Sequence, residues 1–392
     1  MRTHKLVLFS VLFAAALPGC GEKNKSATPH FKTHWTVKVF FKYELCNFIG
    51  ILTGRELYNK YYGDLQSEWR SKMPPPVMQA VKQIDAIIGP EQPPGPRLAI
   101  LFSATMVEDS LKAIIAALDD DQSARRRLLV SDFASEKNWQ QWQLLKPHLR
   151  TVLAFLQKEQ FDRYWAKNLY PKITARLPRL QQELQSYDVA GDIDRFLLEG
   201  ETSDSLMVIA SWLLQPHAIR LTPECYLIDV NYPMHVTVKS AYHELLHPAG
   251  EQLVDSVFAE SFATLRADPF LQQTLAQAEV ALGYRHFMVY CREEVVLAAD
   301  LFLSERRRVI SQLIGANGSN AADAGRAYLE RHEGGVHVLA AVIYSYLEAG
   351  LKLDRMSYAA FLKELFASGR LQAGKIEARY RDFMQNKNLA ER

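Results

Sequence analysis

The residues best suited to chemistry lie together in the stretch His243–His247, which reads His-Glu-Leu-Leu-His. On a helix, two histidines four positions apart lie on one face, about one turn apart, so both imidazoles can bind one metal ion. Glu244 would then reach a zinc-bound water and act as its general base. Helices that merely carry two surface histidines show the same pattern. The rest of the chain must therefore supply a third ligand and a suitable scaffold.

The third ligand is expected among the glutamates that follow the motif, because a catalytic zinc ion takes three protein ligands and keeps one position for water. Glu293 and Glu294 interrupt an otherwise apolar helical segment, residues 287–303, where a buried carboxylate needs a partner. We rank Glu293 first, Glu294 second and Glu260 third. Asp300 lies about two turns beyond Glu293 on the same face, so it is expected to hydrogen-bond a ligating histidine.

A peptidase also needs a donor that stabilises the negative charge developing on the substrate carbonyl oxygen. His286 and Tyr290 are the preferred donors, because both lie close to Glu293 in sequence and His286 shares its helical face. Taken singly, such side chains are more often structural than catalytic. The wider set of candidates also contains Tyr284, His332, His337 and Tyr344.

The first residues of the chain have the composition of a secretory leader. A basic start is followed by an apolar run from Leu6 to Leu17, too short to span a bilayer. The run ends in Leu-Pro-Gly-Cys at Cys20, which resembles the lipobox of bacterial lipoproteins. That resemblance implies that residues 1–19 are removed, that Cys20 is lipidated, and that residues 20–34 form a tether. It also implies attachment to the bacterial cell envelope, at the outer membrane facing the periplasm. The alternative is an ordinary signal peptide with an incidental cysteine.

The composition of the chain excludes several other classes of protein. With 46 basic and 44 acidic residues, the chain has no charge excess that would favour nucleic acid. Cys46, Cys225 and Cys291 are far apart and allow at most one disulfide, so we expect small buried residues rather than a disulfide scaffold. Membrane attachment is expected only through the lipid.

The periodicity of apolar residues predicts an α+β fold that is predominantly α-helical. Strands are predicted at residues 36–41, 98–102, 206–210, 218–221 and 225–230, the last three as an antiparallel meander. Residues 110–196 are predicted to be mostly helical. The motif helix is predicted from Val236 to His247, ending or bending at Pro248. Helices are predicted at residues 253–265, 269–282, 285–313, 321–331, 336–349 and 357–368. We expect an N-terminal α+β subdomain, residues 35–235, and a helical subdomain, residues 236–392.

This order of a small sheet, the motif helix and later helices resembles the zincin metallopeptidases. In their gluzincin branch, the third zinc ligand is a glutamate on a downstream helix, and the edge strand of the sheet aligns the substrate. The segment 290–298 resembles a pattern of gluzincin-like bacterial proteins, with Tyr290, Glu293, Val295, Val296 and Ala298 matching and Leu297 in place of the usual arginine.

Residues 43–54 resemble the strand-then-helix opening of the same group, in which Glu44 belongs to a matching Glu-Leu pair. Glu44 is equally well explained as a carboxylate at a helix start. The resemblance implies a peptidase with one Zn²⁺ ion, acting on a peptide or protein substrate. The alternative is a non-catalytic zincin-fold lipoprotein that binds a partner or has a structural role in the envelope.

Overall fold

The computed structural model describes residues 33–198, 203–282, 286–315, 320–350 and 356–385. Within these ranges the protein is α+β and predominantly helical, as predicted, with one small sheet. The strands are β1 (His34–Lys38), β2 (Ser205–Ser211), β3 (Ile219–Thr222) and β4 (Cys225–Asp229). The predicted leader, the predicted lipidation site at Cys20, and Tyr284 lie outside the described residues.

The helices fall into a group before β2 and a group after β4. The first group comprises α1 (Phe41–Leu52), α2 (Glu56–Ser71), α3 (Pro75–Ile88), α4 (Pro94–Thr105), α5 (Leu111–Ala117), α6 (Asp121–Leu129), α7 (Glu136–Lys158), α8 (Phe161–Asn168), α9 (Tyr170–Thr174), α10 (Leu177–Leu184) and α11 (Val189–Leu197). The second comprises α12 (Met234–Gln252), the π-helical turn η1 (Leu253–Val257), α13 (Ala259–Leu265), α14 (Pro269–Leu282), α15 (Phe287–Arg306), α16 (Val309–Leu313), α17 (Ala321–Arg331), the 3₁₀ turn η2 (His332–Gly335), α18 (Val338–Gly350), α19 (Tyr358–Ala367) and α20 (Ile376–Met384). Of these, α20 was not predicted from the sequence.

The sheet is mixed, with strand order β1-β2-β4-β3. β2 is parallel to both β1 and β4, and only β3 pairs antiparallel, with β4. The prediction of an antiparallel meander is therefore wrong for β2 and β4. All five residues of β4 are buried. Such continuous burial, with four apolar residues before Asp229, is typical of a parallel strand that is covered on both faces.

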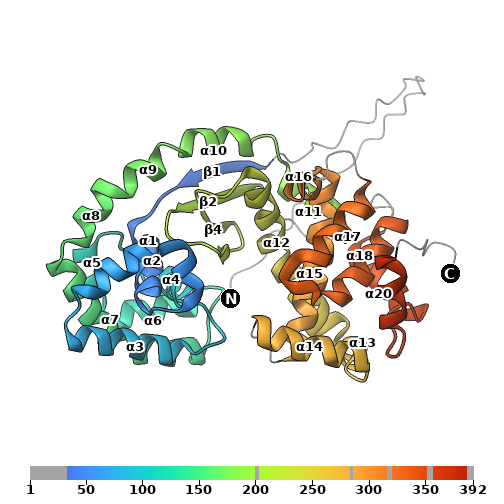
Figure 1. The fold of residues 1–392 in the computed structure, drawn as a ribbon, viewed down its shortest axis with the longest axis horizontal. Coiled ribbons are helices and arrows are strands. Elements are labelled where there is room, and N and C mark those ends of the chain that lie inside the picture. The colour runs from blue at the N-terminus through green and yellow to red at the C-terminus, as the bar shows by residue number, and fades with distance from the viewer. Residues whose placement is uncertain (1–32, 199–202, 283–285, 316–319, 351–355, 386–392) are drawn as a thin grey trace, which may run out of the picture. The chain divides into compact units, whose positions relative to one another are not determined.

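The sheet separates two hydrophobic cores, because alternate side chains of a strand point to opposite faces. Tyr226 and Ile228 of β4 belong to a core shared with α12, α15 and the other C-terminal helices. Cys225 and Leu227 belong to the other core, formed mainly by α1 to α8. Figure 1 shows β2 and β4 beside α12, which contacts both β3 and β4. The motif helix is thus positioned by the sheet on one side and by the C-terminal helices on the other.

The predicted strand at residues 98–102 is wrong, because these residues belong to the helix α4. Pro94 and Pro96 lie in its first turn, where proline is tolerated in a helix. The helix then packs closely on α1, where the Cα atom of Gly95 would lie 2.6 Å from a Cβ atom on Gly50. A continuous apolar run does not distinguish a buried strand from a buried helix.

The motif helix α12 is longer than predicted. It begins at Met234 and continues through Pro248 to Gln252, where the backbone passes directly into η1. Pro248 cannot donate the helical hydrogen bond to the carbonyl of Glu244, yet the packed surroundings keep the helix intact. The sequence predicted that the helix ends or bends at Pro248, and the predicted end is wrong because the helix continues to Gln252. Both motif histidines lie before the proline, within regular helix.

Two further properties concern the cysteines and the apolar character of the helices. Cys46, Cys225 and Cys291 are free thiols in buried positions, which confirms that they are small packing residues. Across the described ranges, none of the helices combines the length and the apolar character that crossing a membrane requires.

Candidate metal centre

The two motif histidines lie on one face of α12. Their rings contact each other edge to face, with 4.8 Å between the ring centroids. Helix α15 packs along this helix at very short range: a Cβ atom on Gly250 would lie only 2.4 Å from Cγ2 of Val296. Only glycine at position 250 permits this approach. The close packing carries the acidic segment of α15 to the face of α12 that bears the histidines.

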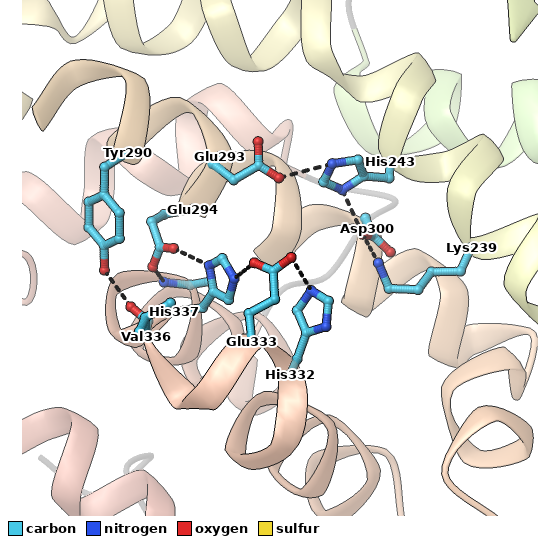
Figure 2. A network of polar contacts seen from close by, with 11 residues as sticks. Lys239, His243, Tyr290, Glu293, Glu294, Asp300, His332, Glu333, Val336 and His337 are labelled. Atoms are coloured by element: carbon cyan, nitrogen blue, oxygen red, sulfur yellow. Dashed lines mark hydrogen bonds and ion pairs between the residues drawn. The ribbon is translucent and has the colours of Figure 1, made fainter. Parts of the chain in front are cut away.

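Glu293 of α15 completes the group. Its Oε1 atom lies 3.0 Å from Nε2 of His243 (Figure 2). One ligand atom from each of His243, His247 and Glu293 lies within 4.8 Å of the other two. Two imidazole nitrogens and one carboxylate oxygen are a donor set that suits zinc, and the spacing allows all three to reach one ion. The residues present therefore fit the implied metal.

A second layer of polar side chains orients His243. Its Nδ1 atom lies 3.0 Å from Oδ2 of Asp300, and the ammonium group of Lys239 donates to the same oxygen at 2.7 Å (Figure 2). Ser304 donates to the other oxygen of Asp300. A carboxylate on Nδ1 holds the proton there and leaves Nε2 free for a metal. The structure thus places Asp300 where the sequence analysis expected it.

Lys239 was missed by the sequence analysis, although a signal was present. It lies four residues before His243, so it shares the helical face of the two histidines. Its side chain is only 12% exposed, and a buried ammonium group requires a charged partner. Asp300 is that partner. The pair keeps the Asp300 carboxylate ionised and in place beside His243.

The two histidines differ in their charge. Burial lowers the pKa of His247 to about 4, so this ring is neutral and offers a lone pair at neutral pH. Burial opposes the charge on His243 as well, but Glu293 and Asp300 outweigh it and raise the pKa to about 10. Burial raises the pKa of Glu293, but the two histidines outweigh this effect and hold the pKa well below its usual range. A metal ion at this site must therefore displace a proton from His243.

Glu244 points toward the sheet. Its Oε2 atom accepts a hydrogen bond of 2.9 Å from the backbone N–H of Arg220 in β3, the edge strand next to β4. Burial raises the pKa of Glu244 to about 7, with the neighbouring His243 charge acting in the opposite direction. A carboxyl group that titrates near neutral pH can both accept and return a proton.

Glu294 faces a different part of the protein. Its Oε1 atom lies 2.6 Å from Nδ1 of His337, and its Oε2 atom accepts from the backbone N–H of Ala340 at 2.8 Å. Glu260, the third candidate for the ligand, lies exposed on α13. Of the three glutamates, the structure brings only Glu293 into the group with the motif histidines.

The preferred oxyanion donors are not brought to the group. The buried hydroxyl of Tyr290 donates to the carbonyl of Val336 at 3.0 Å (Figure 2). The hydroxyl of Tyr344 likewise donates to the carbonyl of Ala321. His286 is exposed and precedes α15 with extended backbone, so the expectation of a shared helical face does not apply to it. The remaining two candidates, His332 and His337, lie together in a separate cluster.

No family model matches this chain, and neither does any curated protein or solved structure. The zincin resemblance remains a prediction from the motif and from the order of the elements.

Proposed function

We propose that this protein is a zinc-dependent metallopeptidase that hydrolyses peptide bonds. The observation that carries the proposal is the convergence of His243, His247 and Glu293 on one point, with donor atoms within 4.8 Å of one another. Glu244 directly follows His243 in the sequence and lies on the same helix, α12. Three ligands and an adjacent carboxylate are the minimum that metal-assisted hydrolysis of an amide requires.

Each residue has a separate role in this proposal. His243, His247 and Glu293 hold the ion, and Asp300 orients His243. Zinc, when bound, supplies Lewis-acid activation of the attacking water and of the scissile carbonyl. Glu244 accepts the proton of the water and passes it to the departing amine, for which a pKa near 7 is well matched.

The edge strand β3 supports a peptide as the substrate. An extended peptide can add to a sheet edge through main-chain hydrogen bonds. The hydrogen bond from Arg220 to Glu244 ties β3 directly to the carboxylate that acts on the water. A peptide lying along β3 would therefore present its backbone to Glu244. We further propose, from the leader and Cys20, that the protein works in the bacterial envelope on a lipid anchor.

One observation favours the alternative of a non-catalytic, zinc-binding envelope lipoprotein. Tyr290, one of the two preferred oxyanion donors, is buried and already donates its hydroxyl proton to a backbone carbonyl. If no other donor replaces it, the site would bind zinc without stabilising the negatively charged oxygen of the reaction.

Metal analysis combined with a peptidase assay separates these possibilities. The wild-type protein should contain zinc at His243/His247/Glu293 and cleave members of a fluorogenic peptide library. Glu244→Gln should retain this zinc and lose turnover by at least about 100-fold, the range expected for removal of a general base. Glu293→Gln should lose the zinc equivalent at this site together with turnover. The exposed Glu260→Gln serves as the matched control and should change neither.

The outcomes are distinct. A zinc content of Glu293→Gln and of His247→Ala equal to that of the wild type would refute the metal site. Zinc bound in wild type with no cleavage of any peptide would support the non-catalytic alternative.

A further inference from the structure

A second cluster of metal-binding side chains lies where α17 ends and α18 begins. One ligand atom from each of His332, Glu333 and His337 lies within 4.8 Å of the other two. Nε2 of His337 lies 2.8 Å from Glu333, and Nε2 of His332 lies 3.9 Å from the other oxygen of the same carboxylate (Figure 2). The two imidazole rings stack with 5.3 Å between their centroids. Both rings therefore turn a nitrogen toward one carboxylate.

A buried carboxylate supports this cluster from behind. Oε1 of Glu294 lies 2.6 Å from Nδ1 of His337, and both side chains are almost completely inaccessible to solvent. A proton held on Nδ1 by Glu294 leaves Nε2 as the metal-binding atom. Asp300 has the same relation to His243 in the first site. Each site thus contains two histidines, one glutamate and a buried carboxylate that orients one of the histidines.

The backbone at Glu333 has an unusual conformation that creates this arrangement. Its φ of 49° and ψ of 33° are left-handed values, which non-glycine residues rarely adopt, and Gly334 follows with a φ of 76°. The turn places the Glu333 carboxylate beside a nitrogen of each ring. The alternative to a metal site is a pair of salt bridges from His337 to Glu294 and Glu333. These salt bridges would explain why the two carboxylates lie beside His337, but they would not explain why His332 lies beside Glu333.

We propose that His332, Glu333 and His337 form a second site for a divalent transition-metal ion such as zinc. Two imidazoles and a carboxylate suit this class of ion and not magnesium or calcium, which prefer oxygen ligands alone. The side chains of His332 and Glu333 are 30% and 34% exposed, so an ion can enter from solvent. This site is distinct from the proposed catalytic one and does not depend on peptidase activity.

The two sites are linked through neighbouring residues. Glu293 and Glu294 are consecutive on α15, so one helix serves both. Lys239, which supports Asp300 in the first site, lies 5.2 Å from the ring centroid of Tyr328, and this ring stacks on His332 at 4.7 Å. A change of charge at one site therefore acts close to the other, and both must be counted when metal is measured.

Titration with Co²⁺ alone tests the proposal. The full-length protein in detergent is stripped with a chelator and titrated while heat and visible absorption are recorded. Wild type should bind two equivalents. Glu333→Gln and His332→Ala should each bind one, as should His247→Ala through loss of the first site. Glu294→Gln should weaken the second site by about 10- to 100-fold. The exposed Glu330→Gln is the matched control and should still bind two.

Each outcome is informative. If Glu333→Gln and His332→Ala bind as many equivalents as wild type, the second site does not exist, whatever His247→Ala shows. If His247→Ala still binds as many equivalents as wild type while Glu333→Gln loses one, the proposed catalytic site is refuted and the second site stands. Far-UV circular dichroism shows that each variant is folded. Because Glu333 and His332 are partly exposed, these changes should not disturb the core.

Discussion

Replacing Gly250 by alanine should push α12 and α15 apart and weaken both the fold and the metal site. The added Cβ atom would lie 2.4 Å from Cγ2 of Val296, a stiff side chain in the core. Such overpacking costs about 1–3 kcal/mol, and the higher helix propensity of alanine returns about 1 kcal/mol. We therefore expect a net loss of about 1 kcal/mol of unfolding free energy.

The same substitution should have the opposite sign in a Val296→Ala background. Removal of Cγ2 makes room for the new methyl group, so only the helix propensity gain of about 1 kcal/mol remains. The coupling free energy between the two positions is then about 2 kcal/mol, well above the additivity expected of independent sites. Gly63→Ala is the control, because a Cβ atom there meets nothing within 4 Å and should be neutral or slightly stabilising.

Urea unfolding of the chelator-treated proteins measures the coupling, and competition with a coloured chelator measures zinc affinity. Metal sites tolerate ligand displacements of only about 0.2 Å, so Gly250→Ala should lower zinc affinity by about tenfold or more, and Val296→Ala should restore part of it. An equal effect of Gly250→Ala in both backgrounds would refute the reasoning. The contact between α12 and α15 would then not set the distance between the histidines and Glu293.

Three further predictions concern individual groups. Asp300→Asn should lower zinc affinity by about 10- to 100-fold without unfolding the protein, as measured by chelator competition and circular dichroism. Zinc affinity should rise about tenfold per pH unit between about pH 6 and 8, because the pKa of His243 is raised to about 10 and zinc must displace its proton; calorimetry in two buffers should detect one proton released per ion. Burial raises the pKa of Glu44 from 4.5 to about 8, so the folded state binds the extra proton between these values and stability falls as pH rises through them. Glu44→Gln should remove this loss, which is on the order of 5 kcal/mol at most, and a pH-independent difference between the two proteins in urea unfolding would contradict the assignment.

The local pattern of the sequence predicted the features that depend on spacing along one helix. The two motif histidines share a face because four residues make about one turn, and Asp300 follows Glu293 by about two turns. The predicted helices at residues 269–282 and 321–331 have the observed bounds. In each case the information lies within a single element, where the helical period determines which side chains lie together.

Features that depend on contacts between distant segments were not predicted. The run at residues 98–102 is apolar on every side, so its period could not show that it packs as a helix against α1. β2 and β4 run parallel because β3 lies at the sheet edge and not between them. No residue in β2 or β4 specifies that place for β3. The left-handed backbone of Glu333 was likewise hidden, since the sequence places a glutamate and not a glycine at the turn.

The choice between Glu293 and Glu294 shows why the proposed third ligand could not be assigned from sequence alone. Both carboxylates lie in an apolar helix and both need partners, so burial favours them equally. Consecutive residues on a helix point about 100° apart, so the two carboxylates must face different neighbours. The structure provides two such neighbours: α12 with His243 for Glu293, and α18 with the adjoining His337 for Glu294. A shift of one residue in the register of α15 would bring Glu294 to the position beside His243, or Glu293 to the position beside His337. The choice of Glu293 as the proposed zinc ligand therefore depends on how α15 packs against α12, where Val296 lies against Gly250.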